Sequence, residues 1–292
     1  MKIAIIGSNG YIGKHLAYYL QQMGESPMCY DIQNVERECY RQVDLANKES
    51  INNIDLNVDY IYMFAGLTGT FAGFDSYEKY FKINELGLLN LLDAIRKSEF
   101  RPKVVFPSTR LVYKGSDKPI KENDEKETKT LYAVNKLACE GILYAYKQSF
   151  DIPYTIVRIC IPYGNLLSTD YSFGTVGFFI RQAKAGNAIP LYGGGYIKRT
   201  FTHIEDLCYQ VVNVAMKEES NGEIYNIGGQ KLSLREVAEF IAQKFGSKVV
   251  TVEWPERDLR IESDNTYFDD SKIRSLLKLS EYKQFDEFTK DI

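Results

Sequence analysis

The stretch KIAIIGSNGYIGKHL, residues 2–16, decides the fold of this chain. Its first part is a short, β-branched apolar run typical of a buried strand, and the residues from Tyr11 onward have the 3.6-residue periodicity of a packed helix. The glycines therefore lie at a strand-to-helix turn. Gly7 and Gly10 let the backbone turn tightly and approach a pyrophosphate, which gains from the free N–H groups at the helix N-terminus. Gly13, which lacks a side chain, lets the helix lie close to the strand.

A carboxylate follows the turn at the expected place. The next apolar stretch ends in Cys29-Tyr30-Asp31, about 20 residues beyond the turn, where the second strand should stop. Asp31 can accept both hydroxyls of an adenosine ribose, whereas it would repel a 2′-phosphate, and no arginine follows immediately. The turn and this carboxylate together predict a dinucleotide site that prefers NAD to NADP.

The composition indicates a soluble enzyme of one or two closely associated domains. With 292 residues, of which 45% are hydrophobic and 26% charged, the chain can bury a substantial core. A net charge of −3 gives no electrostatic reason to expect nucleic-acid binding. The sequence has no uninterrupted apolar span of membrane length, and it opens on a strand pattern rather than a signal peptide. We therefore expect a cytoplasmic protein that binds neither nucleic acid nor a membrane.

Cysteine and histidine usage predicts neither a disulfide framework nor a metal site. The cysteines are scattered without C-x-x-C pairing, so we expect ordinary core or surface residues. They are Cys29, Cys39, Cys139, Cys160 and Cys208. His15 and His203 lack neighbouring metal-ligand partners in the sequence, and no metal is expected.

Strand-like and helical patterns alternate along the first half of the chain. We expect strands at 2–7, 27–31, 59–65, 103–107 and 154–160, and helices near 11–23, 76–97 and 131–149. This alternation predicts an α/β fold, a Rossmann-type doubly wound parallel sheet with helices on both faces.

The pattern becomes less regular beyond about residue 165. It includes a glycine-rich turn at 193–195 and helical patterns near 173–185, 205–218 and 233–245. We therefore expect an NAD-binding domain over residues 1–165. A smaller C-terminal α/β substrate-binding domain would comprise mainly residues 166–292, with the option of chain crossings back to the sheet.

Three residues further along predict proton-transfer chemistry. Tyr132 and Lys136 are four apart in a helical pattern, so both side chains emerge on one face. A tyrosine has a reference pKa near 10, and a neighbouring ammonium favours its phenolate. Thr109 follows the strand KVVFPS, and its hydroxyl could bind the oxygen of an alcohol being oxidised. The same spacing also arises by chance, as a partly buried tyrosine beside a solvated lysine, in a chain with 22 tyrosines.

Further segments carry a resemblance to a known family. They are Asp44-Leu45, FAGL (64–67), Asn84 with GLLNLLDAI, STRLVY (108–113), YAVNK (132–136), Arg158 through Tyr163-Gly164, FFIRQAKAGNAIPLYGGG (178–195) and KRTFTHIEDL (198–207). With the turn at 7–13, they resemble the extended short-chain dehydrogenase/reductases of the nucleotide-sugar epimerase/dehydratase family over nearly the whole chain. FAGL and the Thr-His-Ile near Arg199 resemble its UDP-galactose 4-epimerase branch in particular.

The resemblance implies NAD as cofactor, a nucleoside diphosphate sugar as substrate, and roles for the matching residues. It implies cofactor contacts from Gly7, Gly10, Tyr11, Ile12, Gly13, Asp31, Asp44, Leu45, Phe64, Ala65, Gly66, Asn84, Tyr132 and Lys136, with Asp44 and Leu45 near the adenine. It implies catalysis by Thr109, Tyr132 and Lys136, and substrate contacts from Thr68, Thr109, Phe178, Arg199 and Arg260. Arg199 would bind the diphosphate, because a guanidinium can bind two oxygens at once, and Arg257 or Arg260 would be a second ligand. A homodimer through the helices near 76–97 and 131–149 is also implied, although their apolar faces could equally be core.

Departures from the family pattern narrow the expected reaction. Arg110 and Leu111 stand where the family's 4,6-dehydratases have the Asp and Glu that eliminate water, so we expect neither dehydration nor Glu-dependent decarboxylation. Simple hydride transfer at a sugar carbon remains, with C4 preferred. Thr68 occupies the position of the epimerase's cofactor-binding lysine, and Ile161 replaces an asparagine that contacts the substrate. Both changes weaken part of the epimerase interpretation.

Three functions follow from these observations. The first is an NAD-dependent nucleotide-sugar 4-epimerase that works through a 4-keto intermediate. The second is an NAD(P)H-dependent 4-ketoreductase or 4-dehydrogenase, an interpretation that Thr68 favours. The third, a non-catalytic dinucleotide sensor, is opposed by the presence of both Tyr132 and Lys136.

Overall fold

A computed structural model describes residues 1–168 and 173–292 of the chain. The described chain folds as two compact units. The first comprises residues 1–112, 128–158 and 211–225, and the second comprises the described residues of 113–127, 159–210 and 226–292. The sequence predicts a boundary after residue 165, between an NAD-binding domain and a substrate-binding domain. This division by ligand stays a prediction.

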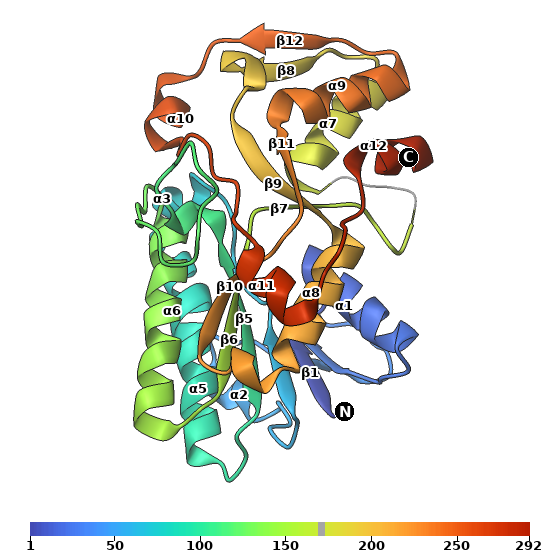
Figure 1. The fold of residues 1–292 in the computed structure, drawn as a ribbon. Helices are drawn as coiled ribbons and strands as arrows, with labels where there is room; N and C mark the ends of the chain where they lie inside the picture. The colour runs from blue at the N-terminus through green and yellow to red at the C-terminus, as the bar shows by residue number, and fades with distance from the viewer. Residues whose placement is uncertain (169–172) are drawn as a thin grey trace. The chain divides into compact units, whose positions relative to one another are not determined.

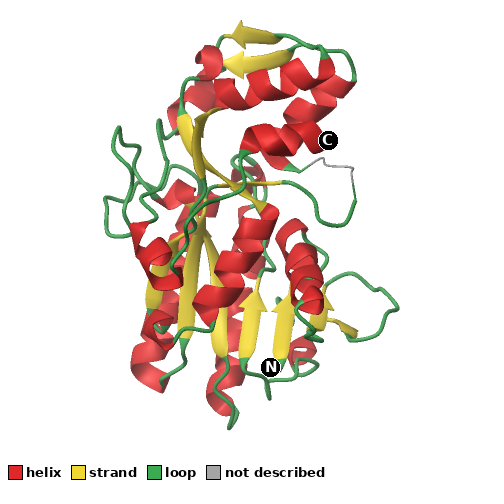
Figure 2. Cartoon of the chain, turned by 45° about the vertical axis from the view of Figure 1, so that its right-hand side comes forward, coloured by secondary structure: helices red, strands yellow, loops and turns green. Residues whose placement is uncertain are grey.

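The first unit is organised around a parallel sheet whose strands follow in the order β10-β6-β5-β4-β1-β2-β3. The strands are β1 (Ile3–Ile6), β2 (Met28–Asp31), β3 (Tyr40–Gln42), β4 (Tyr60–Met63), β5 (Lys103–Thr109), β6 (Tyr154–Ile159) and β10 (Glu223–Asn226). β1 pairs in parallel with both β2 and β4, so the chain winds outward from β1 in two directions. Figure 2 shows these strands side by side with helices packed along them. The predicted Rossmann-type fold class is confirmed.

The helices of the first unit follow the predicted alternation with one difference. They are α1 (Tyr11–Gln22), α2 (Lys48–Ile51), α3 (Ala72–Asp75), α4 (Tyr77–Tyr80), η1 (Phe81–Leu86), α5 (Gly87–Lys97), η2 (Arg110–Val112), α6 (Leu131–Phe150) and η4 (Glu218–Ser220), as Figure 1 shows in part. The single helix predicted near 76–97 is divided, because η1 is a π-helical turn between α4 and α5. Such turns are rare and are often found at functional sites.

Apolar side chains of the sheet and of α5 and α6 form the core of the first unit. Ile6, Ile61 and Val104 of the strands are at most 1% exposed, as are Leu91 of α5 and Leu143 of α6. Burying one such side chain stabilises the fold by about 1.5–3 kcal/mol. The packed core therefore holds the strands in place, and it also holds the residues at the carboxyl ends of the strands.

The second unit contains two smaller sheets. Its strands are β7 (Ile161–Tyr163), β9 (Lys198–His203) and β11 (Gln230–Ser233), in the order β11-β9-β7, together with the parallel pair β8 (Ile189–Tyr192) and β12 (Val249–Val252). Its other elements are α7 (Gly174–Lys184), η3 (Gly193–Gly195), α9 (Leu234–Phe245), α10 (Glu256–Ile261), α11 (Ser271–Leu277) and α12 (Phe285–Asp291). α8 (Ile204–Ala215) belongs to the second unit up to residue 210 and to the first beyond it.

The helix boundaries here have local causes. The patterns near 173–185, 205–218 and 233–245 correspond to α7, α8 and α9. Ser233 and Glu236 form a reciprocal capping box at the start of α9, and Gly246 ends the helix with a positive φ of 66°. These features satisfy backbone groups that a helix end would otherwise leave without partners.

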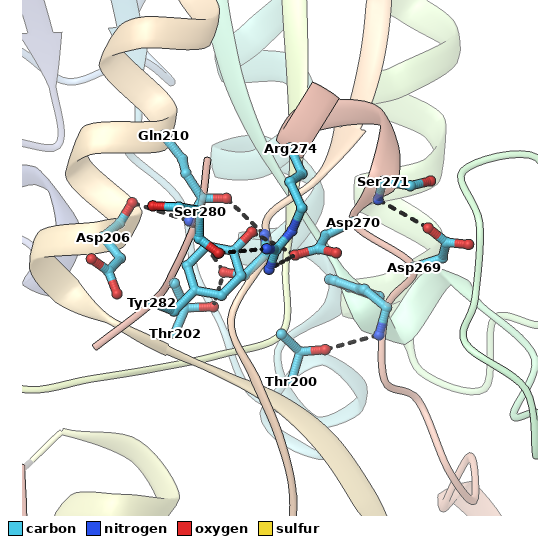
Figure 3. A network of polar contacts seen from close by, with 12 residues as sticks. Thr200, Thr202, Asp206, Gln210, Asp269, Asp270, Ser271, Arg274, Ser280 and Tyr282 are labelled. Atoms are coloured by element: carbon cyan, nitrogen blue, oxygen red, sulfur yellow. Dashed lines mark hydrogen bonds and ion pairs between the residues drawn. The ribbon is translucent and has the colours of Figure 1, made fainter. Parts of the chain in front are cut away.

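A polar network fastens the segment around α11 within the second unit (Figure 3). The Tyr282 hydroxyl donates to Asp270 Oδ2 at 2.5 Å, and Arg274 Nη1 donates to the Ser280 carbonyl at 2.9 Å. A Cβ atom on Gly228 would lie 1.9 Å from the Tyr282 hydroxyl, so only glycine fits there. The segment after α11 is therefore packed directly against backbone.

Candidate functional site

The glycine turn lies at the carboxyl end of β1. Gly7 has a φ of 85°, and a Cβ atom on it would lie 2.4 Å from the Ala65 amide nitrogen. A Cβ atom on Gly13 would lie 2.1 Å from the Gly7 carbonyl oxygen. Gly10 is the N-cap of α1 and has no side chain with which to cap it. The first N–H groups of α1, beginning at Tyr11, can therefore meet an anion.

A cavity of about 250 Å³ adjoins this turn. Eight of the predicted cofactor residues line it: Gly7, Gly10, Asp31, Asp44, Leu45, Phe64, Ala65 and Gly66. Tyr11, Ile12 and Gly13 follow in the first turn of α1. These residues fit a dinucleotide, since backbone N–H groups and an acidic side chain converge on one hollow.

Asp31 is held in place at the end of β2. Its Oδ2 accepts a hydrogen bond from the Asn9 amide at 2.9 Å, and its Oδ1 accepts one from the Gln33 amide at 3.3 Å. Asp44 is held similarly, because its Oδ1 accepts from the Ala46 amide at 2.9 Å. The two carboxylates thus line the cavity in fixed orientations.

Asn84 forms hydrogen bonds with the backbone of the loop after β4. Its Oδ1 accepts from the Leu67 amide at 2.8 Å and its Nδ2 donates to the Leu67 carbonyl at 3.1 Å. The Tyr80 hydroxyl donates to the carbonyl of Thr68 at 2.6 Å. Asn84 and Tyr80 therefore fix the loop after β4, which includes Gly66, and a cofactor contact by Asn84 itself stays a prediction.

The structure brings Thr109, Tyr132 and Lys136 together where β5 ends and α6 begins. Tyr132 forms a side-chain hydrogen bond with Thr109. Lys136 Nζ lies 5.9 Å from the Tyr132 ring centroid and donates to the Pro107 carbonyl at 2.7 Å. A Cβ atom on Gly66 would lie 3.9 Å from Lys136 Nζ, which places the lysine beside the wall of the cofactor cavity.

Burial favours the uncharged forms of both ionisable side chains. It raises the pKa of Tyr132 above its ordinary value, and the hydrogen bond with Thr109 acts in the opposite direction. It lowers the pKa of Lys136 to about 8, against the raising effects of Cys139 and Glu140. The sequence predicts that Lys136 lowers the pKa of Tyr132, but the shift has the opposite direction because loss of solvent disfavours the phenolate.

Arg199 is buried in the second unit and engaged by its own chain. It is 1% exposed, and its Nη2 donates to Glu262 Oε1 at 2.5 Å. Its Nη1 donates to the Lys198 carbonyl at 2.9 Å and also to the Asp264 carbonyl. These partners occupy the guanidinium, which weighs against direct contact with a diphosphate, and the predicted substrate role stays untested.

The other predicted substrate residues are more accessible. Arg260 is 73% exposed by side chain and forms an ion pair with Glu256 one turn earlier on α10, where Arg257 is also exposed. Phe178 on α7 is half-buried, with its ring centroid 6.1 Å from that of Phe179. Their roles in substrate binding stay predictions.

The described residues include neither a cluster of metal ligands nor a membrane-spanning helix. In that part of the chain, no group of three or more His, Cys, Asp or Glu side chains could hold a metal ion. No described helix is both long and apolar enough to cross a bilayer. His15 is buried in α1, where its Nδ1 lies 2.6 Å from the Tyr11 carbonyl oxygen.

Comparison with known proteins agrees with this arrangement of turn, cavity and side chains. Residues 3–228 match the model of the NAD dependent epimerase/dehydratase family. The chain belongs to this family. The predicted resemblance is thereby confirmed, and so is the predicted cofactor, because the NAD-dependent epimerases/dehydratases are defined by their use of NAD.

Relatives of the family cover nearly the whole chain. A Bacillus subtilis protein named "Uncharacterized UDP-glucose epimerase YtcB" is 29% identical over 95% of this chain and 92% of its own. The structure of Thermus thermophilus UDP-glucose 4-epimerase in complex with NAD is 23% identical, covers 99% of this chain and 97% of its own, and superimposes with a TM-score of 0.85. The dTDP-glucose 4,6-dehydratase DesIV of Streptomyces venezuelae is 22% identical, covers 100% and 96%, and also has a TM-score of 0.85. At these identities the two structures establish the fold, which epimerases and dehydratases of the family share.

One group of buried polar residues beside the site was not predicted. Ser108, Glu140 and Arg158 form a hydrogen-bonded cluster at the end of β5, and each is at most 6% exposed. The available signal was the spacing of Glu140, which lies four residues after Lys136 on the same helix face. Spacing alone could not distinguish this placement from a solvated surface glutamate.

Proposed function

We propose that this member of the family is a nucleotide-sugar epimerase that inverts C4 of the sugar through a 4-keto intermediate. The observation that carries the proposal is the cluster of Thr109, Tyr132 and Lys136, in which the first two are hydrogen-bonded and the third lies beside the cavity wall at Gly66. A proton-transfer group next to a dinucleotide cavity is what oxidation and reduction of a secondary alcohol require.

Each residue of the cluster would have a separate role. Tyr132 Oη would take the proton of the C4 hydroxyl and later return it, while the Thr109 hydroxyl would hold the same sugar oxygen. Lys136, whose pKa is lowered to about 8 by burial, would bind a ribose hydroxyl of the cofactor and can share a proton near neutral pH. NAD, held by the residues that line the cavity, would supply reversible hydride transfer at C4, so the net redox change would be zero.

We further propose that the chain is not a 4,6-dehydratase. Dehydration requires an acid and a base placed at the sugar, and the two residues after Thr109, Arg110 and Leu111 in η2, supply no carboxylate there. Family membership alone does not decide this, since the relatives include dehydratases. The proposal therefore rests on these two side chains.

Thr68 favours a second candidate, a 4-ketoreductase or 4-dehydrogenase. This residue is exposed at the loop after β4 and presents a neutral side chain. A lysine there would add a positive charge that attracts the cofactor phosphates. Without it, the cofactor would exchange more readily after each hydride transfer, as a net oxidoreductase needs.

The test is incubation of the purified protein with UDP-, dTDP-, GDP- and CDP-sugars without added reductant. We expect C4-inverted sugar for at least one nucleotide with no stoichiometric change in NADH absorbance, and loss of the product with Tyr132→Phe. A folded, NAD-loaded protein that inverts none of these sugars would contradict the epimerase. A stoichiometric change in NADH absorbance with a 4-keto sugar nucleotide would identify the second candidate.

The proposal includes the substrate domain, the assembly and the location. Residues 166–292 would bind the nucleoside diphosphate, the protein would work in the cytoplasm, and two copies would pair through α5 and α6. α6 supports the pairing because Val134 and Tyr144 on it are 42% and 59% exposed. Light scattering after size-exclusion chromatography measures the mass, and a monomer at micromolar concentration would exclude the dimer.

A further inference from the structure

Three side chains of α6 lie four residues apart and face the end of β5. They are Tyr132, Lys136 and Glu140, and the last two are only 5% and 6% exposed. Residues at this spacing project from one helix face. The function proposed above uses Tyr132 and Lys136 and assigns nothing to Glu140.

Each of the last three residues of β5 forms a hydrogen bond with a different member of this set. The pairs are the Pro107 carbonyl with Lys136 Nζ (2.7 Å), Ser108 Oγ with Glu140 Oε1 (2.5 Å), and Thr109 with Tyr132. The strand end and the helix face are therefore joined at three consecutive positions. The hydroxyl of Ser108 makes the middle contact.

Arg158 on the neighbouring strand β6 neutralises Glu140. Its Nε donates to Oε1 at 2.9 Å and its Nη2 donates to Oε2 at 2.5 Å, and the arginine is 2% exposed. A buried carboxylate persists only when it is paired and hydrogen-bonded, and a two-point contact with a guanidinium also fixes its orientation. Glu140 is thus fixed to two strands, to β5 through Ser108 and to β6 through Arg158.

We propose that Glu140, held by Arg158, is a positioning residue for the reaction proposed above, on which this inference rests. Through Ser108 it sets the position of α6 along β5 and thereby keeps Tyr132 within hydrogen-bond reach of Thr109. Proton transfer needs donor and acceptor atoms about 2.6–3.2 Å apart, so a small shift of the helix lowers the rate. Most of the proposed contacts with the sugar nucleotide lie away from α6, so we expect the shift to lower kcat and to leave KM largely unchanged.

The first measurement compares two serine-to-alanine variants. Ser108→Ala removes the hydroxyl that joins Glu140 to β5, and we expect kcat to fall about tenfold with KM unchanged, because one hydrogen bond to a charged group is lost. Ser220→Ala is the matched control. Ser220 is also buried, at 0% exposure against 3% for Ser108, and its hydroxyl accepts from Lys103 Nζ at 2.7 Å, at the opposite end of β5. We expect the control to lower Tm without lowering kcat.

The second measurement needs no substrate. Amide hydrogen exchange of residues 131–137, the first turns of α6, should become faster in Ser108→Ala and stay at the wild-type rate in Ser220→Ala. If the wild-type protein turns over no sugar nucleotide, the proposed function fails while exchange still decides whether Ser108 and Glu140 position the helix. Faster exchange of residues 131–137 in Ser108→Ala, with the wild-type rate in Ser220→Ala, supports the inference.

Two results would overturn it. One is Ser108→Ala with kcat and α6 exchange both within twofold of wild type. The other is an equal fall of kcat in both variants, since the loss would then follow general destabilisation rather than the contact between Ser108 and Glu140.

Discussion

Tyr132 and Lys136 are adjacent on one helix face, yet each is held in surroundings that favour its uncharged form. Burial raises the pKa of the tyrosine and lowers that of the lysine to about 8. Burial therefore favours a neutral phenol beside a partly deprotonated amine, so Tyr132 is not held as a permanent phenolate. The hydrogen bond with Thr109 is what favours the phenolate here.

The lowered pKa of Lys136 makes stability depend on pH. The value is about 8 in the folded protein and 10.5 ordinarily, so between these pH values the unfolded chain binds more protons. The free energy of unfolding should therefore rise with pH relative to a Lys136→Met variant, by about 3 kcal/mol across the window. Chemical denaturation of both proteins at pH 7 and at pH 10.5 measures the difference. An equal response of the two proteins to pH would show that Lys136 keeps its ordinary pKa.

Helices and strands could be predicted where the pattern that indicates them lies within one short stretch of sequence. The strand and turn at residues 2–13 and the helix at 131–149 follow from periodicity and glycine spacing, and they correspond to β1, α1 and α6. β3 was not predicted because it is a short strand with two exposed polar residues, Arg41 and Gln42, which give no apolar alternation.

Contacts between residues distant in sequence could not be predicted either. The glycine turn is readable because its residues are neighbours along the chain. Arg199 and Glu262 are 63 positions apart, and Ser108 and Glu140 are 32 apart. Charge and spacing show that such residues can pair, but the fold alone selects which partner each one meets.

The close packing of α1 on its strand gives a prediction at the level of the element. Gly13→Ala places a methyl group 2.1 Å from the Gly7 carbonyl oxygen, and we expect it to lower the free energy of unfolding by about 1–3 kcal/mol and to weaken NAD binding. Gly141→Ala is the control, because Gly141 lies within α6 and no atom outside the adjacent helix backbone lies within 4 Å of the added methyl. It should stabilise the protein by about 0.5–1 kcal/mol. Equal stability of the two variants in thermal denaturation would contradict this account of the turn.

At the scale of the whole molecule, each unit of the described chain is assembled from three separate stretches. In the first unit, residues 211–225 return to the sheet after two of the three stretches of the second unit and before its third. Thr155 Oγ1 donates to the Ser220 carbonyl at 2.8 Å, and the Gly222 amide donates to the Tyr154 carbonyl at 2.7 Å. β6 therefore depends on a late segment for its outer neighbour.

This assembly predicts how a truncated chain behaves. A fragment of residues 1–165 lacks β10, the neighbour of β6 in the sheet, and it lacks Val211 and Val212, both of which are 0% exposed in the full chain. We expect the fragment to unfold without cooperativity and to bind NAD poorly, as measured by circular dichroism on heating and by calorimetric titration. A single sharp transition with full-length NAD affinity would show instead that residues 1–165 form an independent domain.

The π-helical turn η1 marks a place where the length of the chain is critical. A π turn holds one more residue than an α turn, and an α-helix rotates by about 100° for each residue. Deleting one residue between Phe81 and Leu86 would therefore restore a regular α-helix. It would also rotate Asn84 away from the Leu67 backbone, with which Asn84 forms hydrogen bonds. The extra residue in the π turn therefore sets the rotation of Asn84 about the helix axis, so the position of the loop after β4 depends on the length of this segment as well as on its side chains.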